Sequence, residues 1–222
     1  MFVAESKSIS KSMETDGLRN RWHNILIRMY CHQVGLRMRT GLILAMIAML
    51  AFNTSAGSVR ERLGSYDVSF DLNTTAKYSV AVEGPSNGVT ENGIKFIDYN
   101  LSVDGGDSLI YLVLRGYKIN NMTDIDSNKT NINTVTGTMN TILGKIDSTQ
   151  RPSVKLYQLP IDGHTGVLEA GRFSSNEVFA CVSYFLDNST SSIKKTNCRV
   201  FSTYPWEITR EMLYSLHVTG PA

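Results

Sequence analysis

DGGDSLIYLVLRGYKI, residues 104–119, is the stretch that decides the fold, because a tight turn leads directly into an apolar strand. Its side chains form two alternating apolar sets: Ile110, Leu112 and Leu114 on one side, and Leu109, Tyr111 and Val113 on the other. A strand that is apolar on both faces belongs in the middle of a sheet. The preceding segment GIKFIDYNLSV, residues 93–103, is expected to pair with it as a hairpin.

Further segments alternate polar and apolar residues and predict two more hairpins and two further strands. SYDVSFDL (65–72) is expected to pair with KYSVAVE (77–83), before the turn-rich residues 83–93. SVKLYQL (153–159) and TGVLEAGR (165–172) are expected as two further strands on either side of IDGH. EVFACVSYFLD (177–187) and NCRVFST (197–203) are expected to form the last hairpin, and pairing Leu186 with Ile193 would place Cys181 opposite Cys198.

Two segments show the periodicity of amphipathic helices. The first carries apolar residues three and four positions apart, namely Ile132, Val135, Met139, Ile142, Leu143 and Ile146. The second begins at Pro205, has its apolar stripe at Trp206, Met212, Leu213 and Leu216, and is expected to end at Gly220-Pro221. Successive hairpins with interspersed helices predict the α+β class, an antiparallel sheet with helices packed on it.

The segment MRTGLILAMIAMLAFNTSAGS, residues 38–58, has the basic start, apolar run and small-residue exit of a secretory signal. Cleavage is expected after Ala56, and an uncleaved signal anchor is the alternative, with residues 40–59 as the membrane contact. Residues 1–37 are then a polar leader, either a cytosolic tail or the product of a mis-assigned start upstream of Met38. Residues 57–222 are expected to form a single extracytoplasmic α+β domain.

Charge argues against a nucleic-acid partner. The chain has 22 Lys and Arg against 20 Asp and Glu. The first 56 residues hold seven of the basic and three of the acidic residues, which leaves 15 and 17 in the remaining 166. The exported part therefore carries a net charge of −2 and shows no basic stripe.

The residues that export would expose to modification are cysteines and sequons. Cys181 and Cys198 would meet a non-cytosolic environment and are predicted to form a disulfide, whereas Cys31 lies in the leader. Asn-x-Ser/Thr triplets, which mark glycosylation or are simply turn sequences, begin at Asn53 and at the candidate sites Asn73, Asn100, Asn121, Asn128 and Asn188.

Searching for chemistry yields no catalytic set, no metal site and no cofactor. Asp162-Gly163-His164 could let Asp162 orient His164 as an acid or base, but the residues also suit an ordinary turn. His217 is expected as a surface cation at the end of the last helix. Trp206, beside Tyr204, either lines a ligand surface or belongs to the core.

Two acidic segments have simpler readings than metal binding. The series Asp124, Asp126 and Asn128 lacks the Gly and Glu that complete a calcium loop, so an ordinary acidic loop is expected there. Asp104 and Asp107 are expected to form a turn.

The strand-helix-strand order, the turn IDGHTGV (161–167), the hairpin with Tyr184 and the ending STYPWE (202–207) resemble PsbP-type domains. They are also similar to small uncharacterised secreted proteins of archaea. The resemblance covers residues 65–218 and implies an α/β/α sandwich whose members mostly act as non-enzymatic binding or assembly subunits. No functional residue of the family matches a position here.

Three functions follow as hypotheses. The first is an exported, non-enzymatic binding or assembly module for an unknown protein or small ligand outside the cytoplasm. The second is a structural glycoprotein of the cell envelope. The third is a hydrolase or redox enzyme that uses Cys181 or His164.

Overall fold

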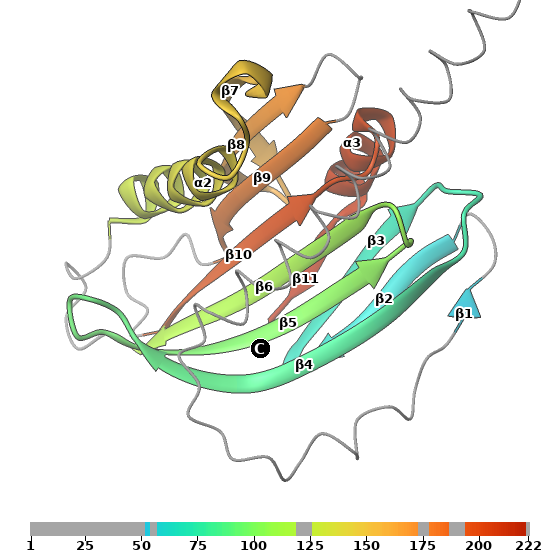
Figure 1. Cartoon of the computed structure of the whole chain (residues 1–222). Coiled ribbons are helices and arrows are strands. Elements are labelled where there is room, and N and C mark those ends of the chain that lie inside the picture. Colours follow the sequence, from blue (N-terminus) through green and yellow to red (C-terminus); the bar gives the residue numbers. More distant parts are fainter. Residues whose placement is uncertain (1–51, 54–56, 119–125, 173–177, 187–193, 221–222) are drawn as a thin grey trace, which may run out of the picture. The chain divides into compact units, whose positions relative to one another are not determined.

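The computed structural model describes residues 52–53, 57–118, 126–172, 178–186 and 194–220. These residues all belong to the second of two compact units, Leu50–Ala222, whereas the first unit is Met1–Met49. The elements appear in Figure 1 and are β1 (Phe52–Asn53), β2 (Gly57–Leu63), β3 (Tyr66–Leu72), β4 (Tyr78–Val89), β5 (Lys95–Asp104), β6 (Leu109–Lys118), α2 (Ser127–Leu143), the 3-10 turn η2 (Ser148–Gln150), β7 (Ser153–Ile161), β8 (His164–Arg172), β9 (Val178–Phe185), β10 (Lys194–Ser202), α3 (Trp206–Ser215) and β11 (His217–Thr219).

The described strands form two antiparallel sheets. The large sheet has eight strands in the order β1-β4-β5-β6-β10-β9-β8-β7, and the small sheet has the order β11-β3-β2. Strand β6 lies between β5 and β10, which confirms the central position predicted for residues 109–118. Ile110, Leu112 and Leu114 are fully buried on one face, while the alternate side chains are half-buried.

The predicted α+β class, with helices packed on one antiparallel sheet as in a PsbP-like α/β/α sandwich, is wrong. Strands make up 58% and helices 20% of the described residues, so the fold is mainly β. The difference arises because β2 and β11 join β3 in a second sheet. Most of the layer that was expected to be helical is therefore made of strands.

The predicted hairpin between residues 65–72 and 77–83 is also wrong. Strand β3 pairs with β2 and β11, whereas β4 pairs with β5 in the large sheet. Strand β4 continues to Val89 past a register shift between Glu83 and Ser86, so the turn-rich stretch is partly strand. Both segments are amphipathic strands as predicted, but their buried side chains enter the same core from two different sheets.

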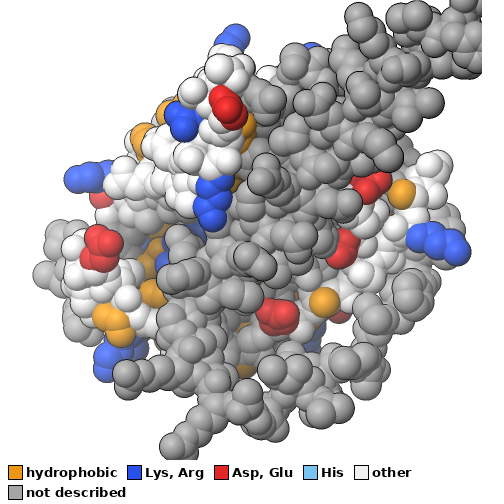
Figure 2. Space-filling view, viewed as in Figure 1, with side chains coloured by type: hydrophobic (Ala, Val, Ile, Leu, Met, Phe, Trp, Pro, Cys, Tyr) orange, Lys and Arg blue, Asp and Glu red, His pale blue; other side chains and the backbone are white. Residues whose placement is uncertain are grey.

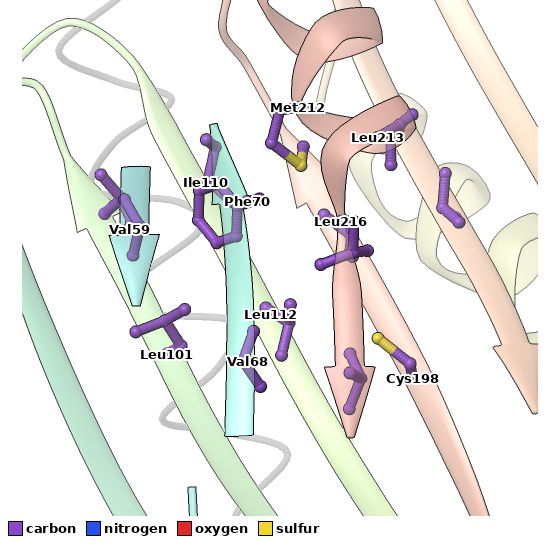
Figure 3. Close-up of a cluster of buried hydrophobic side chains, with 14 of the residues drawn as sticks. Val59, Val68, Phe70, Leu101, Ile110, Leu112, Cys198, Met212, Leu213 and Leu216 are labelled. Atoms are coloured by element: carbon purple, nitrogen blue, oxygen red, sulfur yellow. The ribbon is translucent and has the colours of Figure 1, made fainter. Parts of the chain in front are cut away.

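The main core lies between the two sheets (Figure 3). Phe70 and Val68 of the small sheet lie over Leu101 and Leu112 of the large sheet, and all four side chains are at most 1% exposed. Helix α3 adds Met212 and Leu213 to this cluster. Truncating a fully buried side chain such as Met212 to alanine would cost about 2–5 kcal/mol of stability.

Helix α2 covers the face of β8 and β9 that points away from the core between the two sheets. It confirms the helix predicted from the apolar periodicity of these residues. Asp126 caps it, because the carboxylate accepts the backbone N–H of Lys129 at 3.0 Å. The side chains that the helix itself buries are Asn131, Val135, Met139 and Ile142.

A buried polar cluster accompanies this helix. The side-chain amide of Asn197 donates to Asn131 at 3.0 Å, to Ser183 at 3.0 Å and to the carbonyl of Tyr184 at 2.9 Å. Arg199 donates to Asn197 and to the Tyr117 hydroxyl, both at 2.6 Å. These hydrogen bonds satisfy polar groups that would otherwise be costly to bury.

The hairpin of β9 and β10 is present, but its predicted register is wrong. Tyr184, not Cys181, lies opposite Cys198, and Cys181 lies opposite Phe201. Cross-strand partners point to one face and successive residues alternate, so Cys198 shares a face with Tyr184 while Cys181 points to the other face.

The C-terminal segment is a short helix followed by a strand. Helix α3 ends at Ser215 and β11 pairs with β3, so the expected helix end near Gly220 and the helical position of His217 are wrong. Among the described residues, no helix has the length and apolar character needed to cross a membrane.

Candidate functional site

A groove of about 940 Å³ lies between the outer strands of the large sheet and helix α3. Its volume is within the range of roughly 300–1,000 Å³ found for small-molecule sites. Strands β7 and β8 contribute most of the lining residues and form the floor of the groove. The lining residues are Ser153, Lys155, Tyr157, Gln158, Leu159, Pro160, Ile161, Leu168, Ala170, Gly171, Arg172, Val178, Trp206, Arg210, Leu213 and Tyr214.

Strand register arranges the floor of the groove in successive rows. Ser153 lies opposite Arg172, Lys155 opposite Ala170, and Tyr157 opposite Leu168. The first two rows therefore carry cationic and small side chains, and the next row is apolar. Ala170 contributes only a methyl group, which leaves room above its row for a bound molecule.

Helix α3 forms the wall facing this floor. Trp206, Arg210, Leu213 and Tyr214 are spaced four, seven and eight residues apart, so they share one side of the helix. Glu211 points elsewhere, and its carboxylate accepts a hydrogen bond from the Asn73 side chain at 3.2 Å. The helix thus presents a cation and aromatic rings to the groove.

The wall is fixed at both ends of the helix. Near its start, the Thr209 hydroxyl lies 2.7 Å from the Ser202 hydroxyl and donates to the Tyr204 carbonyl at 3.0 Å. At its end, the Ser215 hydroxyl accepts the backbone N–H of Asp71 at 2.8 Å. These contacts hold α3 against β10 and β3, so the groove is pre-formed.

The described residues that line the groove carry charge of a single sign. Lys155, Arg172 and Arg210 are exposed, and none of the described lining residues is acidic. Among the described residues, no carboxylate forms an ion pair with any of the three. Residues 57–222 as a whole are slightly acidic, so this concentration of positive charge is local.

Exposed aromatic rings lie beside these cations. Tyr157 is 48% exposed and Tyr214 is 75% exposed, and Trp206 is half-buried. On the face shown in Figure 2, by comparison, the described hydrophobic side chains appear as small separate patches. Exposed aromatic rings that line a concave surface are typical of ligand sites.

The alternative in which Asp162 orients His164 is not what the structure shows. Asp162 has a left-handed backbone, with φ 51°, and its carboxylate accepts the Val218 N–H at 2.8 Å and lies 2.6 Å from Nδ1 of His217. His164 instead stacks on Tyr184 with ring centroids 5.8 Å apart, and its Nδ1 is buried without a hydrogen-bond partner among the described residues. Neither residue lines the groove.

Cys181 and Cys198 are both free and buried, and the register sends their side chains to opposite faces of the sheet. A bond between them would require one side chain to cross the sheet, so the geometry that we predicted for the disulfide is absent. Burial raises the pKa of each thiol to about 12. Thiolate chemistry is therefore disfavoured at both positions.

The glycosylation candidates differ in accessibility. Asn73 and Asn128 are exposed, whereas Asn100 is 5% exposed within β5 and could not carry a glycan in this packing. Asn121 and Asn188 lie outside the described residues.

The acidic segments have structural roles. Asp104 accepts the Gly106 N–H at 2.7 Å, as expected of a turn residue, and Asp126 caps α2. Asp124 lies outside the described residues. Within the described part of the chain, no three His, Cys, Asp or Glu side chains gather as ligands for a metal ion.

The groove itself was not predicted from the sequence. Trp206 and Tyr204 were each expected either to line a ligand surface or to belong to the core, and Trp206 does both, because it packs partly against the core. Trp206 lines the groove, whereas Tyr204 is buried in the core. The local signal was the helical spacing of Trp206, Arg210 and Tyr214, but strand β7 could not be assigned to the same site from sequence.

Comparisons with known proteins give no relative for this chain. No protein-family model, curated protein sequence or solved structure matches it.

Proposed function

We propose that the chain is a non-enzymatic binding module that acts outside the cytoplasm and takes a small ligand in the groove between β7, β8 and α3. The observation that carries this proposal is the pre-formed groove of about 940 Å³ with exposed aromatic side chains. The signal-like residues 38–56 support the location.

The chemistry of the candidate residues supports binding over catalysis. Both described cysteines are buried, with the pKa of each thiol raised to about 12, and neither lies in the groove. His164 is stacked on Tyr184 away from the groove. A hydrolase or redox enzyme based on Cys181 or His164 is accordingly the weaker hypothesis.

Exposed sequons at Asn73 and Asn128 favour a second candidate, a structural glycoprotein of the cell envelope. The two candidates differ in what they require of the groove. A binding module needs a groove that a ligand can enter. A structural component of the envelope needs only an outer surface that other molecules can contact.

The test uses Trp206 as a reporter in the full-length chain. The chain has two tryptophans, so Trp22→Phe leaves Trp206 as the single fluorophore excited near 295 nm. The probe is N-phenyl-1-naphthylamine, a neutral apolar dye that accepts energy from tryptophan. We expect it to quench Trp206 saturably and Ala170→Leu, which fills the floor, to weaken that quenching.

Ala81→Leu is the matched control, because it makes the same change at an exposed position of β4 outside the groove. Circular dichroism verifies that each variant is folded. Quenching that is absent, or that is unchanged by Ala170→Leu, would contradict a ligand site in the groove.

A further inference from the structure

We propose that the ligand is a small amphipathic anion, with an apolar or aromatic body and one negatively charged head group. This inference rests on the proposed function and specifies the chemical class of ligand for the same groove.

The charged side chains lie at one end of the groove floor. Arg172 is in the first row, opposite Ser153, and Lys155 is in the second row, opposite Ala170. Arg210 projects from the wall one helical turn after Trp206. Three cations therefore line one groove, and two of them lie in the rows whose remaining side chains are small.

Among the described residues, these cations have no carboxylate partner. The ion pairs found in the described residues join Arg115 to Asp98 and His217 to Asp162, outside the groove. Exposed cations that converge without a carboxylate attract an anion, and arginine side chains offer paired donors to carboxylate, sulfonate or phosphate oxygens.

The following rows supply the apolar half of the site. Tyr157 lies opposite Leu168, and Leu159 lies opposite Gly166. Tyr214 lies one helical turn beyond Arg210, on the same side of α3. A ligand with its head group over Lys155 and Arg210 would rest its body against these side chains, and its apolar surface would leave water.

The binding test compares two dyes that differ in charge. 8-Anilinonaphthalene-1-sulfonate carries the naphthylamine body of N-phenyl-1-naphthylamine with an added sulfonate. In the full-length Trp22→Phe chain, we expect the sulfonate dye to bind at least about tenfold more tightly than the neutral dye, a difference that charge-assisted hydrogen bonds can supply. Raising the salt concentration should weaken the binding of the sulfonate dye and leave that of the neutral dye unchanged. Exposed charges are screened beyond about 8 Å at 0.15 M ionic strength.

Single substitutions test which side chains make the sulfonate dye bind more tightly than the neutral dye. Arg210→Gln should reduce sulfonate binding by about fivefold or more and leave the neutral dye unchanged, as expected for loss of one charge contact. Arg60→Gln makes the same change at an exposed position of β2 and should alter neither. Lys155→Gln tests the same end of the groove from β7 if Arg210→Gln fails to fold.

The outcomes separate this inference from the proposed function. Equal affinity for both dyes, or a sulfonate preference that survives Arg210→Gln and Lys155→Gln, would overturn the anionic ligand class while leaving the groove as a site. If Ala170→Leu changes the binding of neither dye, both the anionic ligand class and the proposed function are contradicted.

Discussion

Nδ1 of His217 lies 2.6 Å from Oδ1 of Asp162, so a contact between residues 55 positions apart holds β11 at the β7–β8 turn. The second carboxylate oxygen accepts the Val218 N–H at 2.8 Å. The Asp162 side chain is 6% exposed, whereas that of His217 is 66% exposed. The buried carboxylate thus joins the outer hairpin of the large sheet to the last strand of the small sheet.

Replacing Asp162 by alanine should lower the free energy of unfolding by about 1–3 kcal/mol, because the Val218 N–H loses its acceptor. The left-handed backbone adds to the loss, since alanine adopts it less readily than Asp or Asn. Asp162→Asn should cost less, because its side-chain oxygen can still accept from Val218. Urea unfolding measures both, and equal losses would show that the acceptor is unimportant.

The two described thiols should resist labelling while the chain is folded. Burial raises the pKa of Cys181 and of Cys198 to about 12, so little thiolate forms at pH 8. In a Cys31→Ser background, we expect slow reaction with a thiol reagent, and labelling of two thiols after denaturation. A disulfide detected by intact mass without reductant, or rapid labelling of the folded chain, would contradict the structure.

Glu169 should make stability depend on pH. Burial raises the pKa of its carboxyl above the ordinary value of 4.5, although a hydrogen bond from Thr136 opposes the shift. Well below pH 4.5 the Glu169 carboxyl is protonated in both the folded and the unfolded chain. As the pH rises above that value, the carboxyl ionises in the unfolded chain before it ionises in the folded chain. The native state therefore loses stability as pH rises through the folded-state pKa.

Glu169→Gln removes this ionisation and should stabilise the chain more at pH 8 than at pH 4. The measurement is the free energy of unfolding of both chains across this interval. Glu83→Gln, at an exposed position of β4, is the matched control and should show no comparable trend. A constant difference between Glu169→Gln and the unmodified chain would refute the burial effect.

The positions of attached glycans test both the export of the protein and the burial of Asn100 within β5. In a host that glycosylates exported chains, we expect glycan at Asn73 or Asn128 and none at Asn100, which is buried within β5. Peptide mass spectrometry of the protein recovered outside the cytoplasm would locate the modification. Glycan at Asn100 would contradict the burial of β5, and an unmodified chain confined to the cytoplasm would contradict export.

Local periodicity in the sequence was sufficient to find many of the elements. The alternation in residues 109–114 identified β6 and its central position, and the three-and-four spacing of Val135, Met139 and Ile142 identified α2. The Asp-Gly turn at residues 104–107 also identified the hairpin of β5 with β6. Strands β7 and β8 were predicted as strands, and the structure pairs them with each other. These signals are local, because backbone geometry alone decides which side chains share a face.

Strand pairing was predicted less well, because an amphipathic strand does not specify which sheet it joins. Strand β3 has the expected buried face, but it pairs with β2 and β11 instead of β4. The register error at Cys198 has a similar origin. An alternating pattern permits several registers, and an odd shift of one strand changes which face each cysteine occupies.

The sequence by itself determined where most of the strands and both described α-helices form, which of their faces are apolar, and that residues 38–56 resemble an export signal. Only the tertiary structure decided that Asp162 contacts His217 and not His164, and that Lys155 and Arg210 line one groove. The reason is physical: side-chain periodicity is set by the local backbone, whereas these contacts depend on how the two sheets and α3 pack over a shared core.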